Sequence, residues 1–592
     1  MPIPLATLSS ASASASPEPK RRVAVVGSGL AGLTAAHFLQ RGGYHVELFE
    51  KGSSVGMDAA SITVDSTRID VPFRVIIPSY YPYLTAIYKH LGIEFASADY
   101  SMEFSSDSSS VWSYTNLTLG DFQMPVPDGL GMGDVGVTRD WMRIGYACIR
   151  FMRRMQTLSS GSTMKEEDEV WASLRGKTIG EYLVAEGYGE DFVQLVFLPF
   201  LASMFTCSLA SALQYPADTV LHFVAKAAFG ARLRKARDGV QRVCQELTHN
   251  LRHIHLNTTV DRIEIPEPGN ITLVCQGTSH RFDALVVATP ADTAAKLVAQ
   301  CKVGEGLRYP PKPLVRALRA VPYEDAHVVT HGDKSVMPAE RAQWRGVNLR
   351  TDSGHGRATA TIWINYAEMT GKGVHMPGGD LFQTVDPSRP LEHVKSNAEF
   401  HRSLLTLESQ RGINDLHCAQ GECGVWFVGA YTAPGVPLLE GCVRMAVEVV
   451  QGMGVDLLGI ELPPPPIRRG ALGRAEYAVG LAPGLVRGEA VEAFFECDSA
   501  RTFAFQCPPV HRLVDALGKS SLVDVRRWAA RLVMWAAWQH LLPLVLGLLA
   551  TIYAALGAVL GTPIAAHVRS LVLGALAFIL CVVLRAYRLV AA

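Results

Sequence analysis

The feature that most constrains this chain is a set of three closely spaced glycines between two short apolar segments near its start. Residues 23–26 read Val-Ala-Val-Val, and residues 46–49 form a second predicted strand. The intervening Gly27, Gly29 and Gly32 suit a tight turn followed by close packing of a helix on a sheet. This order of strand, turn, helix and strand predicts a βαβ unit whose helix N-terminus faces the phosphates of a dinucleotide.

An acidic residue, Glu50, ends the second predicted strand, where a carboxylate accepts the hydroxyls of an adenosine ribose. An acid at this point also disfavours a 2′-phosphate, so the pattern predicts FAD or NAD rather than NADP. A further predicted strand, at 257–263, contributes Val260. The candidate residues of the adenosine-diphosphate half-site are Gly27, Ser28, Gly29, Leu30, Ala31, Gly32, Glu50, Lys51 and Val260.

Length and composition exclude several classes of protein. The chain has 592 residues, which is too long for one core and predicts two or more domains. Lysine plus arginine equal aspartate plus glutamate at 55 each, and no basic stripe with interleaved aromatics occurs, so nucleic acid is not an expected partner. The 11 cysteines lack metal-site spacing, so we expect free thiols in a reducing compartment and no metal. Residues 1–21 predict a disordered leader, not a secretory signal.

The pattern of strands and helices predicts an α/β protein over residues 22–463. We expect a substrate domain to be interleaved in this region, at about 90–230 and 310–400. A continuous apolar strand is predicted over 281–290. A run of four prolines then indicates a linker, and the segment 464–525 receives no functional assignment.

One part of the interleaved domain is predicted to be helical. Residues 138–229 lack strand alternation and are rich in helix formers. Trp141, Met142, Phe151 and Met152 recur there at helical spacing. Packing in the core of a helical subdomain is the favoured interpretation of these side chains, and the lining of a substrate cavity is the alternative.

The C-terminal segment, 526–592, differs in kind from the rest. Residues 532–566 contain no charged side chain, and a second apolar stretch follows a Gly-Thr-Pro break. The length predicts a transmembrane helical hairpin, at about 541–560 and 564–584. Arginines flank both outer ends, so the positive-inside rule places the remainder of the chain in the cytosol. A buried helical pair, or a single span with an interfacial helix, are the alternatives.

A second strand, glycine turn and helix start is predicted far downstream. Residues 424–432 read Gly-Val-Trp-Phe-Val-Gly-Ala-Tyr-Thr, and a helix is expected to begin near Glu440 and Gly441. An NAD dehydrogenase needs no such element, whereas a flavoprotein must close over the ribityl chain and the isoalloxazine ring. The element therefore favours FAD, and it adds Gly429, Ala430, Glu440 and Gly441 to the candidate cofactor-binding residues.

With these motifs the chain resembles the flavin-containing amine oxidase superfamily, which also includes phytoene desaturases and protoporphyrinogen oxidase. More narrowly, it resembles a branch of predicted FAD-dependent oxidoreductases. The resemblance covers about 22–454 and rests on the 424–441 region, on the YPxLxxLxxxLG-like segment 81–92 and on segment 331–338. It implies a Rossmann-like FAD-binding domain of the amine oxidase type with an interleaved substrate domain.

The chain departs from the family pattern at two places. Met57 and Asp58 stand where the family has its second glycine and, in some members, a flavin-linking histidine. Pro72 replaces the glycine of the following Asp-x-Gly-Phe element. These departures imply noncovalent FAD, and they keep open the alternative of a binding protein without turnover.

The resemblance also places His331, Asp333 and Lys334 in a segment that leads back toward the flavin. It suggests His331 as a base near neutral pH and Lys334 as the holder of a water at the flavin N5. His331 and Lys334 are therefore the candidate catalytic residues. The alternative is that His331 merely ends a strand and that Lys334 is solvated.

These observations favour a membrane-anchored FAD-dependent oxidoreductase that oxidises or desaturates a lipophilic substrate taken from the bilayer. A fatty acyl chain, an isoprenoid and a hydrophobic secondary metabolite all suit this description. A flavin amine oxidase producing hydrogen peroxide is one alternative. A non-catalytic, membrane-anchored flavin- or lipid-binding protein is the other. The expected partners are the lipophilic substrate and membrane lipids, and the sequence assigns no oligomeric state.

Overall fold

The structure is a computed structural model, and it describes residues 21–463 with internal gaps. The predicted linker and hairpin lie outside the described residues, as does the leader apart from Arg21. Among the residues that are described, no helix is both long enough and apolar enough to cross a membrane. The gaps are 66, 107–108, 120–121, 129–134, 160–173, 175, 229–231, 352–355 and 368–378.

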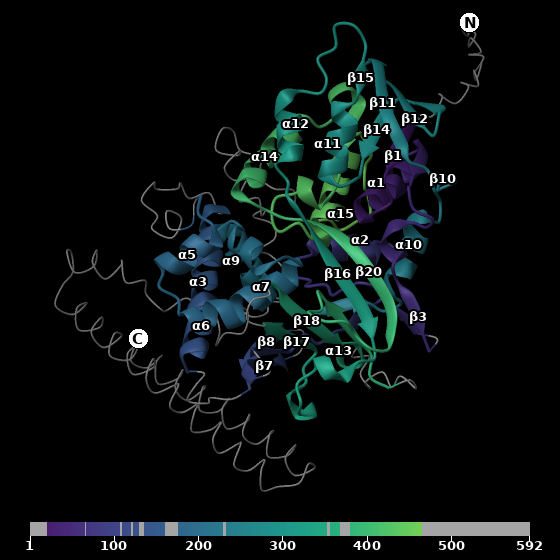
Figure 1. Ribbon diagram of the computed structural model, residues 1–592. Coiled ribbons are helices and arrows are strands. Elements are labelled where there is room, and N and C mark those ends of the chain that lie inside the picture. The colour runs from purple at the N-terminus through teal and green to yellow at the C-terminus, as the bar shows by residue number, and fades with distance from the viewer. Residues whose placement is uncertain are drawn as a thin grey trace, which may run out of the picture.

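A parallel sheet forms the centre of the dinucleotide-binding region, in the upper part of Figure 1. β1 is its middle strand, and alternate residues of β1 face different cores. Val23 and Val25 pack with helices α1 (Leu30–Arg41) and α15 (Leu439–Gly452), whereas Ala24 and Val26 pack with α11 (Ala291–Ala299). The strand order is β10 (His253–His255), β2 (His45–Phe49), β1 (Arg22–Val26), β14 (Ala284–Val287) and β21 (Val425–Phe427).

A second, four-stranded sheet covers one face of the first. β11 (Val260–Glu267) and β12 (Asn270–Cys275) form the predicted hairpin, and β13 (Thr278–Phe282) and β15 (Lys302–Val303) flank it. The continuous strand predicted over 281–290 is wrong, because this segment contributes β13 to one sheet and β14 to the other. The break falls at Asp283, whose carboxylate accepts a hydrogen bond from the Arg22 backbone N–H at 2.6 Å.

The interleaved domain is built on an eight-stranded sheet, in the lower part of Figure 1. Two of its antiparallel partners, β16 and β20, run from the parallel sheet down to the far end of the molecule. The strand order is β20 (Val394–Ser403), β16 (Tyr323–His331), β19 (Phe382–Val385), β18 (Ala358–Trp363), β17 (Val347–Thr351), β6 (Met102–Ser106), β7 (Ser109–Leu119) and β8 (Phe122–Pro127).

The described residues of the range 138–229 are mostly helical, as predicted, and these helices lie together beside the eight-stranded sheet (Figure 1). Trp141 and Phe151 are buried in the core, as expected. Met142 is not, since it is 67% exposed, and the side chain of Met152 lies outside the described residues. The helices are α3 (Val135–Ser159), α5 (Ile179–Ala185), α6 (Glu190–Phe192), α7 (Leu198–Phe205), α8 (Leu209–Leu213) and α9 (Ala217–Ala228).

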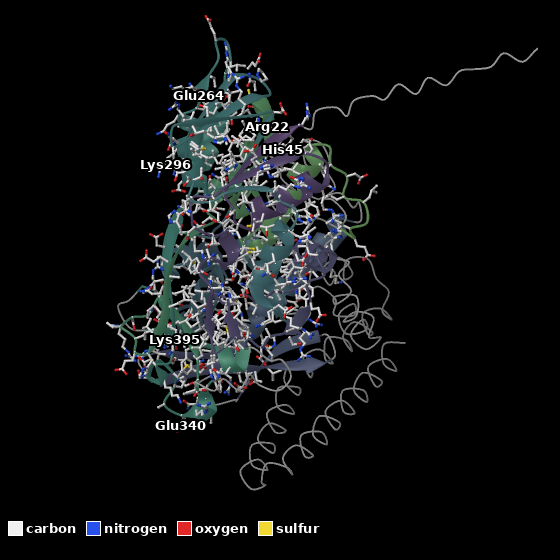
Figure 2. The ribbon with its side chains drawn as sticks, turned by 90° about the vertical axis from the view of Figure 1, so that its right-hand side faces the viewer. Arg22, His45, Glu264, Lys296, Glu340 and Lys395 are labelled. Carbon is white, nitrogen blue, oxygen red and sulfur yellow. The ribbon has the colours of Figure 1, made fainter. Side chains whose placement is uncertain are left out.

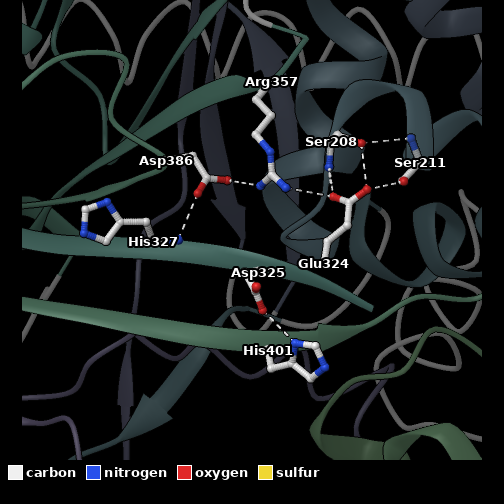
Figure 3. A network of polar contacts seen from close by, with 8 residues as sticks. All are labelled: Ser208, Ser211, Glu324, Asp325, His327, Arg357, Asp386 and His401. Atoms are coloured by element: carbon white, nitrogen blue, oxygen red, sulfur yellow. Dashed lines mark hydrogen bonds and ion pairs between the residues drawn. The ribbon is translucent and has the colours of Figure 1, made fainter. Parts of the chain in front are cut away.

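A charged network fixes this helical group to the sheet (Figure 3). Glu324 of β16 accepts hydrogen bonds from the backbone N–H and the hydroxyl of Ser208, at 2.7 and 2.9 Å, just before α8. Arg357 bridges Glu324 at 3.1 Å and Asp386 at 2.6 Å. These ionic hydrogen bonds lower the pKa of Glu324, so the carboxylate stays charged at neutral pH.

We expect Gly32→Ala to destabilise the fold, because a Cβ at this position would lie 2.0 Å from the Gly27 carbonyl oxygen. The rigid backbone must then shift, at a cost of about 1–3 kcal/mol in the free energy of unfolding. The thermal unfolding midpoint of the purified protein measures this loss.

Gly136→Ala is the matched control, since a Cβ on this helical glycine meets no described atom within 4 Å. It should leave the midpoint unchanged or raise it slightly. Equal midpoints for the two variants would contradict the proposed close approach of α1 to the turn.

Candidate functional site

The predicted glycine turn sits at the carboxyl edge of the parallel sheet, between β1 and α1. Gly27 has φ +105°, and a Cβ there would lie 2.8 Å from the Ala288 carbonyl oxygen, so the fold itself requires glycine. Gly29 is different, because its φ is −62° and a Cβ would meet no described atom within 4 Å. Because Gly29 has no side chain, the space beside it is open and large enough to admit a ligand group. Leu30 and Ala31 begin α1 and are buried beside this space.

Glu50 is held against the turn by hydrogen bonds that the sequence did not specify. One carboxylate oxygen accepts from the backbone N–H and the hydroxyl of Ser28, at 2.9 and 2.6 Å. The other accepts from the backbone N–H of Gly52 at 2.7 Å. A carboxylate has about four lone-pair sites, so this one retains capacity to accept ribose hydroxyls. Lys51, the next residue, is exposed.

The start of the β11 hairpin is also tied to Glu50. The Glu50 backbone N–H donates to the His255 carbonyl oxygen at 2.9 Å, and its carbonyl oxygen accepts from Thr258 at 2.8 Å. Val260 follows directly on β11, and its side chain is buried in the core between the two sheets. Val260 is thus close to the adenosine half of the predicted site, because it lies two residues after Thr258, which is hydrogen bonded to Glu50.

The second predicted junction lies beside the first, because α15 packs along α1. A Cβ on Gly441 would lie 3.0 Å from the Ala433 Cβ and 3.2 Å from the Ala430 carbonyl oxygen, so a small residue is needed here. Cys442 follows in the first turn of α15, and burial raises the pKa of its thiol to about 11. Gly429, just before Ala430, lies two residues after the end of β21. The two halves of the predicted site therefore meet around the start of α1.

Glu440 has a clear structural role. Its two oxygens accept from the backbone N–H groups of Tyr83 and Leu84, at 2.9 and 3.0 Å, at the start of α2 (Pro82–His90). Burial raises the pKa of Glu440 to about 7, and the two hydrogen bonds oppose this shift. The side chain thus caps α2 and fixes it against α15, one residue away from Gly441.

The candidate catalytic residue His331 ends β16, at the opposite end from Tyr323. Tyr323 accepts a hydrogen bond from the backbone N–H of Ala291, next to the glycine turn, and eight residues of strand span about 26 Å. In Figure 2, Arg22 at the start of β1 lies in the upper part of the molecule, and Lys395, which follows the strand partner of His331, lies in the lower part.

Both candidate catalytic side chains are engaged by neighbours. The His331 ring bonds to the Thr384 hydroxyl at 2.7 Å and accepts from the Asp333 backbone N–H at 3.1 Å. Burial lowers the pKa of His331 to about 4, so the ring is neutral at pH 7. Lys334 forms an ion pair with Asp380 at 2.9 Å. These contacts give both residues structural roles, and their catalytic assignment stays a prediction.

Sequence reasoning missed two arginines and one cavity near the turn. The guanidinium groups of Arg74 and Arg402 lie close together, and they come from distant parts of the chain. A cavity of about 20 Å³, the size of one water, borders Gly441. Its wall includes His222, whose Nδ1 is buried without a hydrogen-bond partner and whose pKa burial lowers to about 3. No described group of three or more His, Cys, Asp or Glu side chains is arranged to hold a metal.

We expect His331→Gln to make the free energy of unfolding less dependent on pH under acidic conditions. The folded pKa is about 4 against an ordinary 6.5, so between these values the unfolded chain binds a proton that the folded protein does not. Stability contributed by the neutral ring is therefore present above pH 6.5 and is lost as the pH falls toward 4.

In this pH window the unfolding free energy of the variant should depend less steeply on pH than that of the wild type. The difference in slope should correspond to at most one bound proton. The exposed His253→Gln is the control and should keep the wild-type slope. A wild-type slope in His331→Gln would mean that the ring is already protonated in the fold.

Comparisons with known proteins agree with this geometry. A family model described as an NAD(P)-binding Rossmann-like domain matches residues 25–91. Cyclohexylamine oxidase from Brevibacterium oxydans IH-35A superimposes with a TM-score of 0.50 at 14% identity, over 74% of this chain and 100% of that chain. A putrescine oxidase double mutant gives 0.49 at 13% identity, over 74% and 99%. A fatty acid isomerase from P. acnes gives 0.48 at 15% identity, over 73% and 98%.

A search of curated protein sequences finds no match to the chain. Structural similarity at this low identity establishes the architecture. The α/β prediction, with a Rossmann-like domain and an interleaved second domain, is confirmed at that level. The chain shares its fold with cyclohexylamine oxidase, and its residues 25–91 match an NAD(P)-binding Rossmann-like domain.

Proposed function

We propose that this protein is a FAD-dependent oxidoreductase of the amine oxidase type. The observation that carries the proposal is the meeting of two strand–turn–helix junctions at one edge of the parallel sheet. The first provides the turn 27–32 and Glu50, and the second provides Gly429 and Gly441. In this proposal the first junction binds the adenosine half of the dinucleotide, and the second borders its flavin half.

The residues present fit this cofactor. The open space at Gly29 lies directly before the first turn of α1, where free backbone N–H groups attract a diphosphate. Glu50 would accept the ribose hydroxyls, while Gly429, Ala430 and Gly441 would border the ribityl and ring end. When bound, FAD supplies the two-electron oxidation of the substrate, so the protein's task is to bind and orient both partners and to exclude water.

The proposed substrate is lipophilic, such as a fatty acyl chain, an isoprenoid or a hydrophobic secondary metabolite. The apolar segment at 526–592 supports this part, because a membrane hairpin would keep the enzyme at the bilayer that dissolves such a substrate. The flanking arginines support a catalytic domain on the cytosolic side. Membrane lipids are then its immediate partners.

A second candidate function is the oxidation of simple amines, and the shared fold with cyclohexylamine oxidase favours it. Release of hydrogen peroxide from cyclohexylamine, with no reduction of the bound flavin by a lipid extract, would identify this activity. A bound flavin that neither substrate class reduces would instead identify the non-catalytic binding protein that the Met57 and Pro72 departures suggest.

We expect Gly29→Val to abolish FAD binding without unfolding the protein. The side chain would meet no described atom and suits the backbone angles, φ −62° and ψ 173°, but it would fill the space assigned to the diphosphate. The purified variant should be colourless in the visible spectrum, with a cofactor-free thermal midpoint near that of the wild type.

Two controls define this result. Gly136→Val adds the same side chain to an open helical position away from the turn, and it should retain the flavin spectrum. Glu50→Gln should weaken FAD retention less than Gly29→Val, because it alters hydrogen bonds without filling the space. A full flavin spectrum in Gly29→Val would refute the proposed diphosphate position.

We expect the full-length protein to remain in the membrane pellet after a carbonate wash, because two apolar helices of about 20 residues each would be buried in lipid. Protein truncated before Trp528 should move to the supernatant and still bind FAD, since the proposed site ends before residue 454. Recovery of the full-length protein in the supernatant would show that the segment is not a membrane hairpin.

A further inference from the structure

Two arginines near the glycine turn lack anionic partners. Arg74 follows β4 (Thr67–Ile69), and Arg402 lies near the end of β20. Within the described part of the chain, the Arg402 guanidinium forms no hydrogen bond or ion pair, and its Nε atom is fully buried. Arg74 donates a hydrogen bond to the Met57 carbonyl oxygen at 3.1 Å and forms no ion pair with a described carboxylate.

This arrangement is costly without a bound anion. Burial and the neighbouring Arg74 together lower the pKa of Arg402 to about 10, yet the group is still charged at pH 7. Arg74 acts electrostatically on the carboxyl group of Asp70 but forms no ion pair with it. Asp70 is buried and accepts a hydrogen bond from the Val240 backbone N–H at 3.0 Å, and burial raises its pKa. Two neighbouring like charges that are partly withdrawn from water favour the binding of a counter-ion.

The position of Arg74 links the pair to the glycine turn. Gly56 lies directly against this turn, since a Cβ on it would be 3.0 Å from the Gly29 Cα, and its N–H donates to the Ser28 hydroxyl at 2.8 Å. Met57 follows Gly56, and Arg74 is hydrogen bonded to its carbonyl oxygen. Arg74 is therefore held against the Gly56–Met57 segment that packs on the glycine turn.

Arg402 is linked to the same region through the start of α15. Its charge acts on Cys442, which follows Gly441 in the first turn of α15. α15 packs along α1, the helix that begins directly after Gly29. Both arginines therefore lie near the point where the glycine turn and the start of α15 meet.

We propose that Arg74 and Arg402 bind the diphosphate of the dinucleotide cofactor beside the glycine turn. The inference rests on the proposed function and adds to it the residues that neutralise the cofactor. An arginine fork binds phosphate oxygens in a bidentate manner, which backbone N–H groups alone do not offer. It also accounts for Met57, because side-chain cations replace the close backbone contact that a glycine there would allow.

The test compares three ligands on the cofactor-free full-length protein: FAD, ADP and riboflavin. FAD and ADP carry the diphosphate, whereas riboflavin carries the ring without it. Arg402→Met and Arg74→Met should each weaken FAD and ADP binding by about tenfold or more and leave riboflavin binding unchanged, since a charge-assisted hydrogen bond is worth roughly 1.5–3 kcal/mol. Arg402→Lys, which keeps the charge, should bind ADP more tightly than Arg402→Met.

Arg316→Met is the matched control. Arg316 is exposed and pairs with Asp415 on a distant helix, so its loss should change none of the three affinities. Thermal unfolding supplies a readout that also checks folding. Without cofactor, Arg402→Met should melt at or above the wild-type temperature, because an unpaired buried charge is gone. With saturating ADP, its stabilisation should be smaller than that of the wild type.

Each outcome separates the two proposals. Unchanged FAD and ADP affinities in both variants would overturn the arginine inference and leave the FAD proposal intact. An equal loss of riboflavin affinity would overturn it too, because the arginines would then face the ring. If the wild type bound ADP but not flavin, the FAD proposal would fail and the diphosphate inference would stand. If it bound neither ligand, both would fail.

Discussion

The close approach of α1 to the turn that precedes it is the constraint on which the rest of the site depends. Gly32 allows this approach, because any Cβ there would collide with the Gly27 carbonyl oxygen. α15 then packs along α1, and Glu440 at the start of α15 caps α2. A single glycine contact therefore sets the positions of three helices. The same contact fixes where the free N–H groups at the start of α1 point, so fold and ligand recognition share one origin.

The parts that the sequence predicted well are those where one local pattern implies one structure. The strands at 22–26 and 45–49, the helix between them and the junction at 425–452 follow from apolar runs and glycine positions alone. The single strand predicted over 281–290 failed because apolar continuity gave no weight to Asp283. The Asp283 carboxylate accepts a hydrogen bond from the Arg22 backbone N–H at the start of β1. The break between β13 and β14 falls at this residue. The predicted burial of Met142 is wrong for a related reason. Helical spacing gives the period of a pattern, but it does not specify which face of the helix is covered by other elements.

The contacts of His331 and of the two arginines could not be predicted because they depend on tertiary environment. His331 has the residue type of a base, but burial against Thr384 leaves it neutral and fully bonded. Arg74 and Arg402 have the residue type of surface cations, yet the fold brings them together from opposite ends of the described chain. Residue type and spacing specify which groups are available, and only the packing decides which of them are desolvated and which lack partners.

The contrast between the neutral, fully bonded His331 and the charged Arg74 and Arg402 indicates how the proposed cofactor site works. The described residues that gather around the glycine turn are mostly small or supply backbone N–H groups. The charged groups there are the Glu50 carboxylate, which accepts hydrogen bonds from the turn, and Arg74 and Arg402, which form no ion pair with a described carboxylate. Such a lining suits the binding of an anionic cofactor that carries the redox chemistry, and it asks little acid–base chemistry of the protein. Partly buried cations without a counter-ion also destabilise the empty protein, so cofactor binding would recover stability that the fold alone forgoes. Binding and folding would then be coupled through the same two side chains, and the empty protein would be the form most sensitive to heat.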